Sequence, residues 1–318
     1  MEIDPINPSF IAKIKNIDLK KINSHTENAD LLRKLLSKYK VLIFENQNCS
    51  TPEEFESISS IFGNSDYRSK VTTGYFKGVV CSTPLSPVHV LTRHSETYSE
   101  YPFVFGGDWH SDGSYDIETI NKNAYYTMLY SKQIPSEGGN TEFIDLVSSY
   151  SQLPTSLQDM MKDWEIIHNS YGRYSLKEAI QSLGTKSFAS HFFLPVIHTE
   201  QEIKELCKIN KTFKMLSLIE LQKEGISYPL FLKHPHTQEK ALFINSSFAS
   251  QISHLSKEES DKWLNLLLTS QEHYSLKYTL KWEPNMLIIW DNRVVNHKAL
   301  PSKGERMMFR MIICDTIK

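Results

Sequence analysis

The sequence has few cysteines, no long apolar run and almost no net charge. Its four cysteines are spread over 318 residues without CxxC spacing, at Cys49, Cys81, Cys207 and Cys314. Such scattered thiols are typical of a protein that keeps them reduced, so we expect a cytoplasmic protein without a zinc cluster.

The apolar segments are too short for a membrane helix. The longest runs, such as 286–290, fall far below the roughly 20 residues that cross a bilayer. The first residues, MEIDPINPSF, are acidic and interrupted by two prolines, so we expect no secretory signal. With 35 Lys+Arg and 37 Asp+Glu, the net charge is −2, and we expect neither nucleic acid nor a membrane as a partner.

The composition is that of a globular protein, with 40% apolar and 23% charged residues. The length is compatible with two domains, but the chain lacks a linker rich in Pro, Gly or Ser and has no repeat, so we predict a single domain over 1–318. Compact apolar runs predict strands at 41–46, 240–245, 285–290 and 306–313.

Two capping signatures predict helices. Thr51 can cap a helix that begins at Pro52, and we expect this helix to run to about Phe62 and end at Gly63. The pair Ser256 and Glu259 has the same signature. The apolar face expected after it consists of Trp263, Leu266 and Leu267. Helices in the first part and strands behind favour a β-sandwich or barrel with flanking helices over a βαβ alternation.

Histidines and carboxylates at strand spacing provide candidate metal ligands. In the segment DWHSD, His110 can share a face with Asp108 or Asp112, and spacing does not choose between them. With a distant second histidine, such a pair builds the facial triad of non-haem Fe(II). His297, which follows the apolar run 286–290, is a candidate for it. Alone, each pattern is more often a turn or a structural histidine.

The strand predicted at 306–313 places Arg306 and Arg310 on one face, roughly 13 Å apart. Both faces are otherwise apolar, and a buried guanidinium needs an anionic partner. A bound carboxylate is one candidate, because arginine offers it a bidentate fork. An edge strand with solvated arginines is the alternative.

Two further segments contain polar residues near predicted strands. The turn EGGNT ends at Thr141, whose hydroxyl is expected to be free at the start of a strand. His234 and His236 have strand spacing as well, but Pro235 between them favours a hairpin turn and a structural role.

In combination these segments resemble the TauD/TfdA family of Fe(II)- and 2-oxoglutarate-dependent dioxygenases. The resemblance runs from about Phe10 to Asp315. WHSDGSY resembles the iron-binding WHxD segment, EGGNTEF the Gly-Gly-x-Thr turn, and WEPNMLIIWDNRVVNH the run into the distal histidine. VLIFENQNCSTPEEFESISSIFG is similar to the first strand and helix, and KHPHTQEKALFIN to a structural stretch of the family.

The resemblance implies a mainly β fold with flanking helices around a double-stranded β-helix, a cupin-like jelly roll. The residues that match the Fe(II) ligands are His110, Asp112 and His297. Thr141 and Arg306 match the pair that holds 2-oxoglutarate. Arg310 matches a position that meets the anionic end of the substrate.

The implied activity is oxidation of a C–H bond, most simply by hydroxylation, in a small substrate with a carboxylate or sulfonate. The reaction would use Fe(II) as its cofactor, consume 2-oxoglutarate and O2, and release succinate and CO2. Desaturation or decarboxylation of an amino-acid-derived natural product is an alternative at the same site. A catalytically silent metal-binding barrel and a zinc hydrolase are alternatives from other classes, and the hydrolase would not need Thr141 or Arg306. A homo-oligomer is compatible with all of these.

The sequence departs from the family in two places. Gln238 stands where the family usually has glycine. The segment 64–107 is longer than in taurine-oxidising members, and neither His89 nor His94 aligns with their substrate-binding histidine. We therefore expect a substrate other than taurine, under a lid formed by 64–107 and by parts of a helical insert at about 165–230.

Overall fold

The protein is described from a computed structural model, which covers residues 1–6, 10–65, 79–81, 87–93, 106–117, 121, 123–169, 199–202, 205 and 225–316. Most of the predicted lid at 64–107 and of the insert at 165–230 lies outside these residues. The described ends of the insert are strands, β10 (Glu165–His168) and β11 (Ile226–Pro229), and not helices as we expected.

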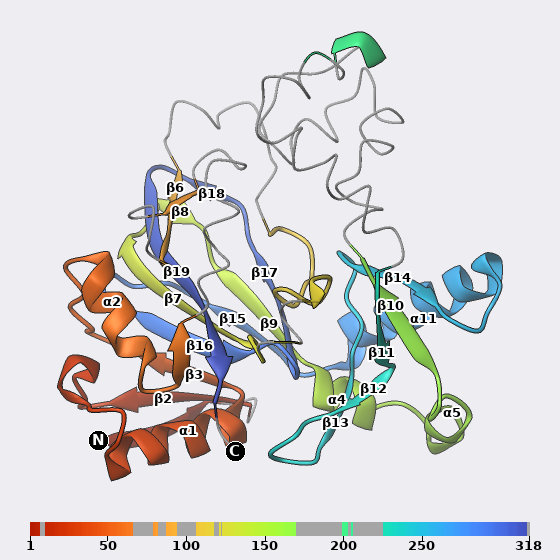
Figure 1. Ribbon diagram of the computed structural model, residues 1–318, viewed down its shortest axis with the longest axis horizontal. Coiled ribbons are helices and arrows are strands. Elements are labelled where there is room, and N and C mark those ends of the chain that lie inside the picture. The colour runs from red at the N-terminus through yellow and green to blue at the C-terminus, as the bar shows by residue number, and fades with distance from the viewer. Residues whose placement is uncertain are drawn as a thin grey trace.

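A nine-stranded sheet forms the centre of the molecule (Figure 1). Its strands follow the order β1-β2-β3-β16-β7-β19-β6-β5, and β4 pairs with β19. Their bounds are β1 Glu2–Ile6, β2 Ile11–Lys15, β3 Val41–Phe44, β4 Gly63–Ser65, β5 Val79–Cys81, β6 His89–Arg93, β7 Tyr126–Gln133, β16 Leu287–Asp291 and β19 Arg306–Asp315. All neighbours are antiparallel except β2 and β3.

Smaller sheets complete the β structure. One has the order β15-β9-β17, with β9 Thr141–Asp145, β15 Lys277–Leu280 and β17 Val295–Ala299. Another joins β11, β10 and β14 (Ala249–Ile252), and the pairs are β12 (Phe231–Lys233) with β13 (Lys240–Leu242) and β8 (Glu137–Gly138) with β18 (Ser302–Lys303).

Alternation along the central strands produces two cores. In β16, Ile288 and Trp290 belong to a core shared with Phe143 of β9 and Val295 of β17, so the main sheet and the β15-β9-β17 sheet face each other. The intervening Leu287 and Ile289 belong to a second core, shared with helices α1 (Glu27–Tyr39) and α2 (Pro52–Ser59). A strand that is buried on both faces appears in the sequence as a continuous apolar run, which is why these segments were recognisable. Together the sheets form the predicted jelly roll.

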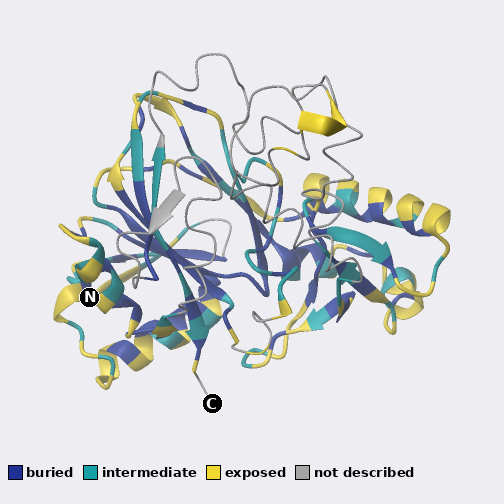
Figure 2. Cartoon of the chain, turned by 45° about the horizontal axis from the view of Figure 1, so that its top comes forward, coloured by how far each residue is buried: buried dark blue, intermediate teal, exposed yellow. Residues whose placement is uncertain are grey.

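Helices cover the outer faces. Their bounds are η1 Leu19–Lys21, α1 Glu27–Tyr39, α2 Pro52–Ser59, α4 Leu146–Ser151, α5 Thr155–Met160 and α11 Lys257–Tyr274. Figure 2 shows exposed residues along their outward sides and buried residues in the central strands. No helix formed by the described residues is both long and apolar enough to cross a membrane.

The two capped helices differ in detail from the prediction. Thr51 caps α2 by accepting a hydrogen bond from the Glu54 amide, but the helix ends at Ser59, not near Phe62. Gly63 begins β4 instead, where a Cβ atom would lie 2.0 Å from the Cys314 carbonyl oxygen.

Helix α11 begins with the predicted capping box between Ser256 and Glu259. The prediction that Leu266 belongs to its buried face was wrong, because this side chain is 53% exposed. The buried face consists of Ser260, Leu264, Leu267 and Gln271.

Candidate metal centre

A short β-bridge brings two of the predicted ligands together. The His110 amide donates to the His297 carbonyl (3.0 Å), and the His297 amide donates to the His110 carbonyl (2.9 Å). His297 is the third residue of β17, so a rigid sheet positions it. The centroids of the two imidazole rings are 4.1 Å apart.

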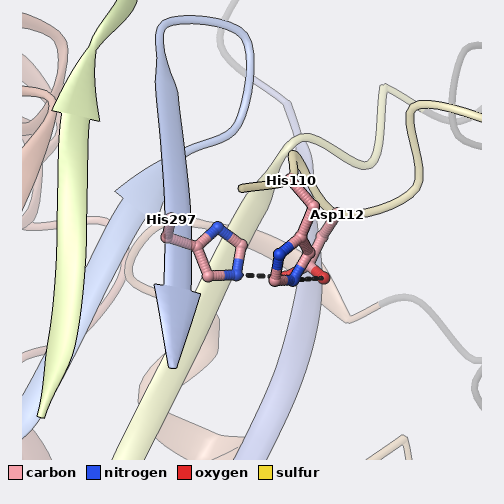
Figure 3. A group of neighbouring side chains, drawn as sticks. All are labelled: His110, Asp112 and His297. Carbon is pink, nitrogen blue, oxygen red and sulfur yellow. Dashed lines mark ion pairs between the residues drawn. The ribbon is translucent and has the colours of Figure 1, made fainter. Parts of the chain in front are cut away.

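Asp112 completes the group from a turn that follows the bridge. Its Oδ1 lies 3.8 Å from His110 Nε2, and its Oδ2 lies 3.6 Å from His297 Nε2. One ligand atom from each of the three residues lies within 4.8 Å of the others, and Figure 3 shows the side chains converging on one point. Our expectation that a strand places His110 and Asp112 on one face was wrong, because the chain turns at Asp112 and Gly113 has a φ of 72°.

The choice between Asp108 and Asp112 is decided by backbone geometry. His110 Nδ1 lies 2.8 Å from the Asp108 carbonyl oxygen, so Nδ1 carries the proton and donates it. The lone pair of His110 Nε2 is then directed towards Asp112, and this is the tautomer that a metal ligand needs. Asp108 acts through its backbone, while Asp112 contributes the carboxylate.

Residues between and beside the ligands fasten the turn to β17. Ser111 Oγ donates to Asn296 Oδ1 (2.7 Å), and both side chains are buried. Lys298 Nζ lies 4.3 Å from the centre of the Trp109 ring, a cation–π contact. The ligand positions are therefore defined by side-chain contacts as well as by the β-bridge.

The electrostatics keep Asp112 and His297 in their ligating forms. Burial alone would raise the pKa of Asp112, but the charge of Arg310, the two histidines and a hydrogen bond from Thr127 hold that pKa well below its usual range. Burial, followed by the charge of His110, holds the pKa of His297 well below its ordinary value against the opposing effect of Asp112. Two imidazole nitrogens and a carboxylate form a donor set that fits Fe(II) and leaves coordination positions open.

Arg310 contacts this group directly. Its Nη2 lies 2.8 Å from Asp112 Oδ1, and its Nη1 lies 3.3 Å from His89 Nδ1. Strand β19 lies between β7 and β6, so the alternative of an edge strand with solvated arginines was wrong. We also did not predict that Asp112 provides the anionic partner, since the two residues are far apart in sequence.

His89 is a site residue that the sequence alone did not identify. It lies directly opposite Arg310 in the pairing of β6 with β19. Only this strand register, between segments more than 200 residues apart, shows that His89 faces the site. His94 lies outside the described residues.

The predicted 2-oxoglutarate residues lie at strand ends. Thr141 begins β9 and pairs with Ala299, two residues after His297. Its hydroxyl accepts a hydrogen bond from Trp282 Nε1 (3.0 Å), so it is not free as we expected, although it retains its own hydrogen for donation. Gly138 and Gly139 before it have φ values of 68° and 73°, as predicted for the turn. Arg306 begins β19 and is half-buried.

The second histidine pair has a structural environment. His234 Nε2 lies 2.9 Å from Asp291 Oδ2, while His234 Nδ1 accepts hydrogen bonds from the amides of His236 and Thr237. His236 Nε2 lies 2.7 Å from Asp315 Oδ2. Three of their four ring nitrogens are thus hydrogen-bonded within the protein, in agreement with the structural interpretation.

Comparison with known proteins gives the same family. The model of the taurine catabolism dioxygenase TauD, TfdA family matches residues 2–312. An α-ketoglutarate-dependent sulfonate dioxygenase of Saccharomyces cerevisiae is 26% identical over 308 residues, which are 94% of this chain and 63% of that protein. An α-ketoglutarate-dependent 2,4-dichlorophenoxyacetate dioxygenase of Cupriavidus pinatubonensis is 25% identical over 93% of this chain and 91% of its own length.

Solved structures share the fold. AAD-2 in complex with Mn(II) and N-oxalylglycine is 20% identical, with a TM-score of 0.69 over 99% of both chains. A taurine dioxygenase from Burkholderia xenovorans is 19% identical, with a TM-score of 0.68 over 99% of this chain and 90% of its own. The predicted jelly roll and the predicted enzyme class, an oxidoreductase that uses Fe(II), 2-oxoglutarate and O2, are confirmed. The chain belongs to the TauD, TfdA family of dioxygenases.

Proposed function

We propose that the protein oxidises a C–H bond of a small organic anion, with Fe(II) held by His110, Asp112 and His297. The observation that carries this proposal is the convergence of one ligand atom from each residue within 4.8 Å. Bound Fe(II) would supply the oxidising chemistry, with 2-oxoglutarate and O2 as cosubstrates. Hydroxylation is the simplest outcome, with succinate and CO2 as the other products.

We assign the remaining binding roles to three residues. Thr141 and Arg306 hold 2-oxoglutarate: a buried hydroxyl and a guanidinium provide the donors that a carboxylate needs. Arg310 binds the anionic group of the substrate. Its contacts with Asp112 and His89 involve two of its three nitrogens, and a guanidinium has five N–H donors.

Aromatic side chains beside the ligands suit the hydrocarbon part of such a substrate. The Tyr115 and Phe248 rings lie 4.4 Å apart, and Phe248 lies 6.5 Å from the His110 ring in an edge arrangement. Relatives named for sulfonates, for 2,4-dichlorophenoxyacetate and, in Pseudomonas putida, for a sulfate ester support an anion attached to an apolar body. We propose a substrate of this kind.

The test is succinate release in the presence of Fe(II), 2-oxoglutarate and O2, with alkyl sulfonates, sulfate esters and aryloxyacetates as trial substrates. For the best substrate, Arg310→Ala should raise KM by about 10- to 100-fold, because one charge-assisted hydrogen bond contributes about 1.5–3 kcal/mol. The KM for 2-oxoglutarate should change little.

Arg306→Ala is the matched control, and we expect the opposite pattern. The KM for 2-oxoglutarate should rise, while the KM for the substrate should change little. Equal damage to both parameters in Arg310→Ala would assign Arg310 to the cosubstrate site. An Mn(II) titration of each variant separates these effects from loss of the metal.

A further inference from the structure

A chain of hydrogen bonds leads from the main sheet to the carboxylate of Asp112. Asn292 Oδ1 accepts from the Asp112 amide (3.1 Å) and from Trp290 Nε1 (3.0 Å). Asn292 Nδ2 donates to the Tyr125 carbonyl (3.0 Å) and to Thr127 Oγ1 (2.8 Å). These four contacts fix the orientation of the Asn292 amide, because its oxygen faces two donors and its nitrogen faces two acceptors.

The direction of the last bond follows from this orientation. Thr127 Oγ1 lies 2.7 Å from Asp112 Oδ2. A threonine hydroxyl has a single hydrogen, and here its oxygen already accepts from Asn292, so the hydrogen is donated to Asp112. The oxygen that receives it is the one that lies 3.6 Å from His297 Nε2.

Asp112 depends on these contacts because the sheet does not hold it. The β-bridge ends at His110, and the chain turns immediately afterwards. Asn292 therefore provides the amide of Asp112 with the acceptor that a neighbouring strand would otherwise offer. Thr127, in contrast, is fully buried in β7 and paired on both sides, with Trp290 of β16 and Ile312 of β19.

We propose that Asn292 and Thr127 are positioning residues for the metal. Asn292 holds the turn, and the hydroxyl of Thr127 sets the rotation of the carboxylate so that Asp112 faces both imidazoles before the metal arrives. This inference rests on the proposed metal site. Partners that orient a ligand in this way typically change metal affinity by about 10- to 100-fold when they are removed.

The test compares Thr127→Val, which preserves shape but lacks the hydroxyl, with Thr127→Ser, which retains it. Mn(II) affinity is measured on metal-free protein without cosubstrate, and thermal unfolding is followed on the same samples. We expect Thr127→Val to bind Mn(II) about 10- to 100-fold more weakly and Thr127→Ser to bind within about threefold of the wild type.

Ser131→Ala provides a matched control on the same strand. Ser131 is also fully buried, and its hydroxyl donates to the Glu283 carbonyl (2.5 Å), far along β7 from Asp112. This variant should unfold at a lower temperature but bind Mn(II) as the wild type does. If Thr127→Val unfolds earlier and yet binds Mn(II) normally, Thr127 is merely structural and the inference is wrong.

Asp112→Ala distinguishes this failure from failure of the metal site itself. If Asp112→Ala loses Mn(II) affinity while Thr127→Val keeps it, only the positioning role is rejected. If the wild type and Asp112→Ala bind Mn(II) equally, the proposed metal site is rejected together with the inference.

Discussion

Two clusters in this protein contain the same kinds of side chain and have different consequences. The metal centre has two histidines, an aspartate and an arginine, which are His110, His297, Asp112 and Arg310. The second cluster, which we call the rear network, has two histidines, two aspartates and an arginine: His234, His236, Asp291, Asp315 and Arg293. The residues that follow β16 contribute to both, because Asn292 bonds towards the metal centre while its neighbours bond into the rear network.

The distances separate the two clusters. In the rear network the histidine–carboxylate distances are 2.9 and 2.7 Å, and Arg293 bonds to both carboxylates and to the Tyr126 hydroxyl. In the metal centre the histidine–carboxylate distances are 3.8 and 3.6 Å, longer than hydrogen bonds. The Nε2 atoms of both histidines in the rear network are thus bonded to carboxylates, whereas those of the metal centre leave room for an ion between them and Asp112.

The largest expected effect comes from breaking the rear network. Arg293→Leu would leave Asp291 and Asp315 as buried carboxylates without their guanidinium, which typically costs about 3–5 kcal/mol of unfolding free energy. Urea unfolding measures this change.

Arg310→Leu is the matched control in the metal centre. Its ion pair with Asp112 is partly reached by water, with side chains 18% and 11% exposed. We expect its cost to be less than half of that for Arg293→Leu. Equal costs would remove the energetic contrast between the clusters.

Metal binding should stabilise the protein through one cluster only. A metal ion that binds only the native state raises the unfolding free energy by about 2.7 kcal/mol when its free concentration is a hundred times Kd. We expect this increase in the wild type and in His234→Gln, and no increase in His297→Ala. If Mn(II) stabilised His297→Ala, or failed to stabilise His234→Gln, the assignment of metal binding to the metal centre would be wrong.

His168 provides a third histidine environment, which should be recognisable by its effect on the pH dependence of stability. His168 in β10 is fully buried against Phe243, with ring centroids 5.1 Å apart, and burial lowers its pKa to about 3. The unfolded chain takes up a proton below its ordinary pKa of about 6.5 and the folded protein does not, so stability is lost as the pH falls through this window.

Between pH 6.5 and 5.0 this histidine should account for about 1.7 kcal/mol of lost stability. The full slope of about 1.4 kcal/mol per pH unit is reached only below about pH 6.5, the pH at which the unfolded imidazole is half protonated. Urea unfolding of the wild type and of His168→Phe at several pH values isolates the effect. A variant that is as acid-sensitive as the wild type would mean that other groups dominate.

Much of the fold and of the site was predictable from local sequence. Continuous apolar runs identified β3, β13, β16 and β19, and ordered motifs identified the family with its ligands. The end of α2 was not predictable, because Gly63 is required by contact with Cys314 and not by a helix terminus. Leu266 was misplaced because a short apolar pattern does not fix the angle of a helix face.

The contacts between distant segments were the part that sequence could not supply. The pairing of Arg310 with Asp112 and His89 depends on strand register. The rear network forms where the turn between β12 and β13 and the end of β19 meet the end of β16. Cytoplasmic location, a homo-oligomer and the lid remain predictions.

The most direct test of the central claim is an anaerobic titration of metal-free protein with Fe(II) and 2-oxoglutarate, followed by the weak visible charge-transfer band of the chelate. We predict a band in the wild type and in His234→Gln, none in His297→Ala, and weakened 2-oxoglutarate binding in Arg306→Ala. Intact, iron-loaded wild-type protein without the band, or a band that survives in His297→Ala, would contradict the account and favour a zinc hydrolase or a silent barrel.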